Sequence, residues 1–261
     1  MRRKLKMNER RDEIRRENKK ALKKFILIIV IAAAFGGAAG LLGTIFRENI
    51  IKFAGILTGS TSINILFYIF LAVFLIIHMG AFYTYRKYKK VKEFWDGEDE
   101  ETADRIEEKI SYVIWAEYIA TALGFLYFAL MLGTENFESL SLWKGIAVFA
   151  VFIINVVLIT LIQQKCVDLE KEMSPEKQGS VYDTKFNEKW LESCDEAERM
   201  MIYRSAWTSY RVMGTAYVIA WAVTFLAHEF FNTGLFACCV VIVLWMIQNS
   251  VYCYKSIHLS K

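Results

Sequence analysis

Residues 63–85 read INILFYIFLAVFLIIHMGAFYTY. Within this run, His78 is the one acidic or basic residue. A helix needs about 20 mostly apolar residues to cross a hydrocarbon core about 30 Å thick. The stretch therefore predicts a transmembrane helix, and the rest of the chain contains more stretches of the same kind.

Five further stretches approach or reach that length, at residues 25–46, 111–133, 143–162, 205–227 and 235–254. With 261 residues, 55% of them hydrophobic and only one proline, the chain is too apolar for an ordinary soluble domain. The apolar runs are continuous and do not alternate, which excludes a β-barrel. We predict an all-α polytopic membrane protein with six transmembrane helices. A basic segment, residues 1–24, precedes the membrane domain, residues 25–261.

Basic residues gather on one side of the predicted spans. Of the 32 Lys and Arg residues, 29 lie before residue 25, within 86–109 and 165–211, or in the C-terminal tail; the other three are Arg47, Lys52 and Lys144. Such residues stay on the cytoplasmic side of short loops during insertion. We therefore expect both termini in the cytoplasm, with cytoplasmic segments at about 86–110 and 163–204. The net charge of +4 then reflects topology and does not indicate a nucleic-acid partner.

The N-terminal segment, residues 1–24, holds 12 basic residues immediately before the first span. Such a segment is expected to attract anionic lipid headgroups, at about 1 kcal/mol per basic residue near the surface. A basic start before an apolar run also resembles a signal peptide. The apolar run continues to Phe46, beyond the core length typical of signal peptides, so an uncleaved span is favoured.

An acidic block, residues 96–108, precedes the third predicted span. Acidic side chains favour the N-terminal end of a helix because they complement its dipole, so a solvated helix start is the preferred interpretation. A cation site is the alternative. The EF-hand spacing requires glycine at the sixth position, which is Glu101 if Asp96 is the first, and whether the loop binds a cation stays open.

The fourth predicted helix is expected to continue past its span to Met173, where Ser174 and Pro175 end it. Asp183 is the predicted N-cap of the next helix. An apolar stripe is expected along that helix, formed by Phe186, Trp190, Cys194, Ala197 and Met201.

An internal repeat links the third and fourth spans with the fifth and sixth. Residues 103–106 (ADRI) resemble residues 197–200 (AERM) at an offset of 94, and residues 162–164 (IQQ) resemble residues 247–249 (IQN). Units with an even number of spans give parallel repeats. We expect the six spans to form paired-hairpin repeats, with the first hairpin as a more diverged third copy.

The central polar segment resembles an uncharacterised family of Gram-positive bacterial membrane proteins, domain of unknown function 3169. The likeness rests on Val167-Asp168-Leu169-Glu170-Lys171, Pro175-Glu176-Lys177, Lys185-Phe186 and Lys189-Trp190-Leu191-Glu192-Ser193-Cys194-Asp195-Glu196-Ala197-Glu198. The resemblance implies a multi-pass protein of the bacterial cytoplasmic membrane. It implies no activity and supplies no catalytic residues.

Motifs of known enzymes do not assemble into a site. Three short patterns resemble the intramembrane prenyl-protease signature, namely Glu100-Glu101 with Arg105, Phe74 with His78, and His228 with Asn232. The order of the patterns along the chain differs from that of the protease signature, because Phe74 and His78 precede Glu100 and Glu101. The two histidines are also expected at different depths in the membrane. The five cysteines lie in the central cytoplasmic segment or the last span, without a CxxC pair, so neither a disulfide framework nor a zinc site is predicted. We predict no catalytic, cofactor or metal site.

Polar residues inside the spans are the better candidates, because ionisable groups in hydrocarbon are costly and mark functional or pairing sites. His78, Glu117, Asn155 and Arg211 are all expected in the cytoplasmic half of the membrane. Glu117 and Arg211 occupy equivalent repeat positions, which predicts an ion pair between the third and fifth spans. The structural alternative is that Glu117 and Arg211 extend to the interface while His78 and Asn155 make ordinary interhelical hydrogen bonds.

Two functions are compatible with this layout. The first is a non-enzymatic protein of the cell envelope that acts as an accessory, sensory or protective partner of another membrane component. The second is a small transporter that uses the inner polar layer as a substrate or proton path.

Overall fold

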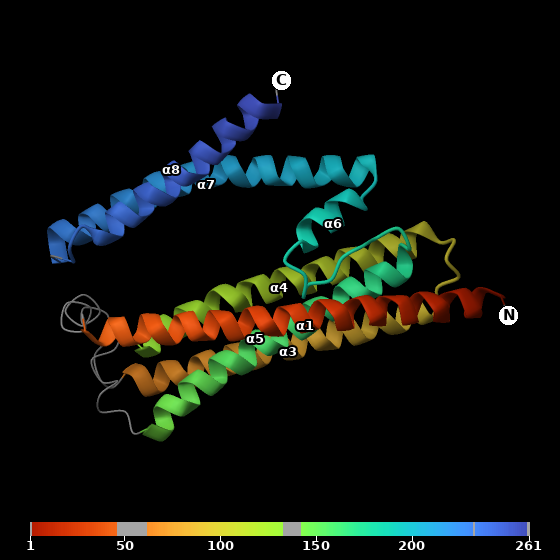
Figure 1. Cartoon of the computed structure of the whole chain (residues 1–261), viewed down its shortest axis with the longest axis horizontal. Helices are drawn as coiled ribbons and strands as arrows, with labels where there is room; N and C mark the ends of the chain where they lie inside the picture. The colour runs from red at the N-terminus through yellow and green to blue at the C-terminus, as the bar shows by residue number, and fades with distance from the viewer. Residues whose placement is uncertain (1, 46–61, 133–141, 232, 260–261) are drawn as a thin grey trace. The chain divides into compact units, whose positions relative to one another are not determined.

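The computed structural model describes residues 2–45, 62–132, 142–231 and 233–259, and within these ranges every regular element is a helix. This confirms the all-α prediction for the described residues. In chain order the helices are α1 (Arg2–Ile45), α3 (Ser62–Phe94), α4 (Glu100–Leu132), α5 (Leu142–Met173), α6 (Phe186–Glu192), α7 (Glu196–Phe231) and α8 (Phe236–Leu259) (Figure 1).

Five of the described helices are long and apolar enough to cross a membrane, and these are α3, α4, α5, α7 and α8. The first predicted span, residues 25–46, lies within α1 as far as Ile45, and Phe46 falls outside the described residues. Six spans therefore stay a prediction. Helices α3, α4 and α5 have 33, 33 and 32 residues, so each is about 50 Å long and extends well beyond a hydrocarbon core of about 30 Å.

The chain divides into two compact units, residues 1–194 and 195–261. In the first unit, α3, α4 and α5 pack against one another and α1 contacts α5. Two apolar clusters fill this bundle. One joins the C-terminal parts of α3 and α5 to the N-terminal part of α4, around Tyr85, Ile110 and Cys166. The other lies toward the opposite ends, around Phe74 and Tyr127.

The second unit is the α7–α8 hairpin. Gly234 has φ +81° in the connection, a backbone conformation that favours glycine. Rings stack across the two helices where Tyr210 meets Tyr252, with centroids 4.7 Å apart. The Tyr210 hydroxyl donates to Asn249 Oδ1 at 2.8 Å. Both predicted repeat copies, α4–α5 and α7–α8, are helical hairpins, but the repeat relation itself stays a prediction.

Helix ends follow local sequence at two of the predicted places. Helix α4 begins within the acidic block, with Glu100 and Glu101 in its first turn, and Asp99 Oδ1 accepts the Glu101 N–H. Helix α5 ends at Met173, directly before Ser174 and Pro175, as predicted.

The predicted continuous helix from Asp183 to Met201 is wrong. Helix α6 ends at Glu192 and α7 begins at Glu196. Asp195 and Glu198 form a capping box, because Asp195 Oδ1 accepts the Glu198 N–H at 2.8 Å and Glu198 Oε2 accepts the Asp195 N–H at 2.9 Å. This reciprocal cap begins a new helix and interrupts the predicted apolar stripe. Lys185, not Asp183, is the N-cap of α6.

Candidate functional site

A buried polar layer crosses the three-helix bundle between its two apolar clusters. It consists of His78 on α3, Glu117 on α4 and Asn155 on α5, whose exposed fractions are 8%, 0% and 2%. His78 Nδ1 lies 3.3 Å from Glu117 Oε1 and 3.2 Å from Oε2. His78 Nε2 lies 2.9 Å from Asn155 Oδ1. One imidazole therefore joins all three helices.

The hydrogen bonds of this layer constrain its protons. Asn155 Nδ2 lies 3.4 Å from the Ala120 carbonyl oxygen, which directs Oδ1 toward His78. Because that oxygen only accepts, His78 Nε2 must carry a proton and donate it. His78 Nδ1 then faces the Glu117 carboxyl group, and a proton on either partner would join the two by a hydrogen bond.

Gly124 on α4 makes room for the asparagine. A Cβ atom at this position would lie 2.5 Å from Asn155 Nδ2, closer than real Cβ contacts come. Since Asn155 is held by His78, any larger residue at position 124 would displace it from the imidazole. The glycine is thus part of the polar layer.

The structure brings together three of the four predicted polar residues. Arg211 lies on α7 in the second unit, where it is exposed. The predicted ion pair between Glu117 and Arg211 would join the two units, and it stays a prediction. Within the first unit, His78 is the partner of Glu117, an assignment that the sequence analysis did not make.

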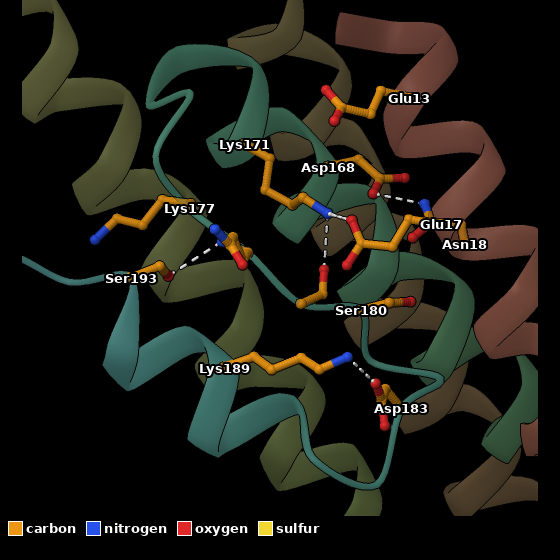
Figure 2. Close-up of polar contacts among 12 residues, drawn as sticks. Glu13, Glu17, Asn18, Asp168, Lys171, Lys177, Ser180, Asp183, Lys189 and Ser193 are labelled. Carbon is orange, nitrogen blue, oxygen red and sulfur yellow. Dashed lines mark hydrogen bonds and ion pairs between the residues drawn. The ribbon is translucent and has the colours of Figure 1, made fainter.

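A second polar cluster, called the junction below, joins α1, α5 and the segment 174–195 (Figure 2). Lys171 on α5 is 0% exposed. Its Nζ donates to Glu17 Oε2 on α1 at 2.7 Å and to the Gly179 carbonyl at 2.8 Å. One buried ammonium therefore fixes both α1 and the following segment to the end of α5.

Gln164 on α5 is the second centre of the junction. Its Oε1 accepts from Ser180 Oγ at 2.9 Å and from the Val181 N–H at 2.7 Å. Its Nε2 donates to Asp168 Oδ1 at 2.7 Å, an oxygen that also accepts from Asn18 Nδ2 at 2.8 Å. The Gln164 amide group therefore makes hydrogen bonds to side chains and to the backbone of the segment 174–195.

Glu172 extends the junction to α3. Its Oε2 accepts from Lys92 Nζ at 2.6 Å and from Arg11 Nη2 at 3.1 Å. Lys92, on α3, is 7% exposed. Three helices thus meet at one carboxylate, beyond the apolar parts of α3 and α5.

The segment 174–195 folds against itself as well as against the helices. Lys177 Nζ lies 3.4 Å from Cys194 Sγ and 5.5 Å from the Trp190 ring centre, and both Lys177 and Cys194 are buried. Gly179 has φ +117°, with the Phe186 ring 3.0 Å from where its Cβ would lie. That backbone conformation strains any other residue.

Asp183 and Lys189 form the outermost ion pair of the segment, at 2.6 Å. The hydrogen bond from Lys189 and one from the Lys185 backbone N–H lower the pKa of the Asp183 carboxyl below its ordinary value. The same hydrogen bond raises the pKa of Lys189. Asp183 thus stabilises the turn before α6 and does not cap the helix.

Sequence reasoning missed this junction because its charges looked like those of a solvated cytoplasmic segment. A signal was present: Asp168, Lys171, Lys177 and Lys189 are all among the residues on which the family resemblance rests. Among the residues that the structure describes, no three of the His, Cys, Asp and Glu types are placed to hold a metal ion.

Comparison with known proteins gives a family and no activity. No curated protein and no solved structure was found to be similar to the chain. A family model described as "Protein of unknown function (DUF3169)" matches residues 17–256, which include the polar layer and most of the junction. The chain belongs to this family.

Proposed function

We propose that the chain is a multi-pass protein of the bacterial cytoplasmic membrane, with both termini inside, which acts without catalysis as an accessory, sensory or protective partner of another envelope component. The basic residues before residue 25, at 86–109 and at 165–211 support this orientation. The junction adds to it, because its buried ion pairs gather at the same ends of α3 and α5 as these basic segments.

The observation that carries the proposal is the difference in burial between the two units. In α3, α4 and α5, 22%, 28% and 22% of a hydrophobic stretch of 18 residues is buried, against 0% in α7 and 6% in α8. The first unit therefore supplies its own packing partners. Taken by itself, the α7–α8 hairpin leaves apolar side chains such as Val223 and Val243 exposed, and the proposal assigns another membrane component to cover them.

Site-specific photo-crosslinking in native membranes tests this function. A photoreactive amino acid at Val223 or at Val243 is expected to give an adduct with the same protein from both positions. Ile76 on α3 is 71% exposed and serves as the matched control, where lipid adducts are expected. Lipid adducts alone at all three positions would contradict a partner that binds through the hairpin.

A small transporter is the second candidate, and the buried polar layer favours it, because intramembrane ionisable residues often mark substrate or proton paths. The contact between the His78 imidazole and the Glu117 carboxyl group is the kind of pair that a proton relay would use. Substrate-dependent flux in reconstituted vesicles, lost in Glu117→Gln and retained in Asn249→Leu, would support transport. Equal flux through wild type and Glu117→Gln would remove the polar layer from any transport path.

A further inference from the structure

A groove of about 410 Å³ lies between α3 and α5, on the surface of the first unit. Its walls are apolar, with Leu75 and Phe82 on one side and Leu158 on the other. His78 and Asn155 also border the groove, but they are buried and hydrogen-bonded to each other. The groove therefore offers apolar contact along its length and few free hydrogen-bonding groups.

Cations lie at one end of this groove. Lys165 is exposed and lines it, with Nζ 5.9 Å from the centre of the Tyr85 ring. Arg86, also exposed, stacks on Phe82 with its guanidinium carbon 4.5 Å from the ring centre. The described residues that line the groove include no carboxylate, so Lys165 is the one side chain in its wall with a permanent charge.

The length of the groove matches one leaflet of a bilayer. Its apolar lining runs from Leu71 to Phe82 on α3 and from Val151 to Ile162 on α5. At 1.5 Å per helical residue each wall is about 16 Å long, close to half of a hydrocarbon core of about 30 Å. An acyl chain lying in the groove would end at Lys165 and Arg86.

We propose that this groove is a binding site for an anionic phospholipid, with an acyl chain between α3 and α5 and the phosphate held by Lys165 and Arg86. Basic pockets between transmembrane helices bind anionic headgroups in this way. The placement in the cytoplasmic leaflet rests on the proposed orientation. The binding itself rests only on the groove and its cations.

Native mass spectrometry of the full chain, after exchange into phosphatidylglycerol or phosphatidylcholine, tests the site. Wild type retains phosphatidylglycerol in preference to phosphatidylcholine. Lys165→Gln and Arg86→Gln each weaken that retention about fivefold, and the double variant about 25-fold, from the known attraction per basic residue. Leu158→Trp fills the groove without changing charge and also reduces retention, while Leu75→Trp repeats this test from the opposite wall.

Lys90→Gln is the matched control, because Lys90 is an exposed cation on α3 outside the groove lining, and this variant retains the lipid. Equal retention by wild type, the double charge variant and both tryptophan variants would identify general boundary lipid and overturn the site. Equal retention of the two phospholipids by wild type would overturn the assignment to an anionic lipid. Thiol labelling from outside intact cells measures the orientation separately, so a reversed topology would change the leaflet and leave the lipid result unaffected.

Discussion

Both units of this protein contain helices that are long and apolar enough to cross a membrane, yet the contacts inside each unit differ. The first unit contains a buried polar layer and a buried ionic junction, in which Glu117 and Lys171 are both 0% exposed. Within the described part of the second unit, Cys238 is the one side chain that is buried. The comparison teaches that long apolar helices occur in both units, whereas among the described residues the buried polar and charged side chains all lie in the first unit.

The largest expected difference between the units comes from removing a lysine. Lys171→Met leaves Glu17 without its cation and the Gly179 carbonyl without its donor. Breaking a buried ion pair costs 3–5 kcal/mol, and because Glu17 is 40% exposed we expect about 3 kcal/mol, near the lower end. Chemical unfolding in detergent measures this loss of stability.

Lys255→Met in α8 is the matched control, since Lys255 is exposed, and its expected change is within about 0.5 kcal/mol. A loss for Lys171→Met as small as that of Lys255→Met would show that the junction does not stabilise the first unit.

A glycine substitution gives the next largest contrast, with opposite signs in the two units. Gly124→Ala places a Cβ 2.5 Å from Asn155 Nδ2, which displaces the amide from His78 at a cost of about 1–3 kcal/mol. Gly214 on α7 has nothing within 4 Å of its Cβ position, so Gly214→Ala is expected to stabilise by up to about 1 kcal/mol. Thermal unfolding of the two variants checks the signs, and a neutral Gly124→Ala would mean that the polar layer is loosely packed.

The smallest expected effect is the loss of stability at low pH when the ion pair between Asp183 and Lys189 is broken. The pKa of Asp183 is lowered from its ordinary value of 3.8, so its ion pair contributes fully above that value and is lost as pH falls through the lowered pKa. Lys189 is 42% exposed, which limits the contribution to about 0.2–1 kcal/mol. The stability difference between wild type and Asp183→Asn should therefore shrink as pH falls below the ordinary carboxyl range. A difference that grows with acid would have the wrong sign.

The common level of His78, Glu117 and Asn155 in the bundle was predictable from the sequence, and their contacts were not. Counting helical residues from the basic ends of the spans placed His78, Glu117 and Asn155 in one layer, because helical rise is constant. That count does not give the rotation of each helix about its axis, so the pairing of His78 with Glu117 was missed. The same reasoning aligned Glu117 with Arg211 through the repeat. Equivalent positions in a repeat do not have to be in contact.

The junction was harder to predict, for a different reason. Glu17 and Lys171 are 154 residues apart, and each lies in a segment whose mixed charges are typical of solvated helices. Only the packing of α1 against α5 buries them together. The break between α6 and α7 had a local signal, since Asp195 and Glu198 have capping-box spacing, but the apolar stripe was given more weight.

The central claim is that Glu117 joins the bundle through His78, and a double-mutant cycle tests it most directly. Unfolding of the detergent-solubilised protein is measured for Glu117→Gln, His78→Leu and Arg211→Met, each alone and with Glu117→Gln combined with either of the others. We predict a coupling energy between Glu117 and His78 of about 0.6 to 1.7 kcal/mol, between the mean and the maximum found for interhelical hydrogen bonds in a membrane protein. Additive losses for Glu117 and His78, with coupling between Glu117 and Arg211 alone, would contradict the account.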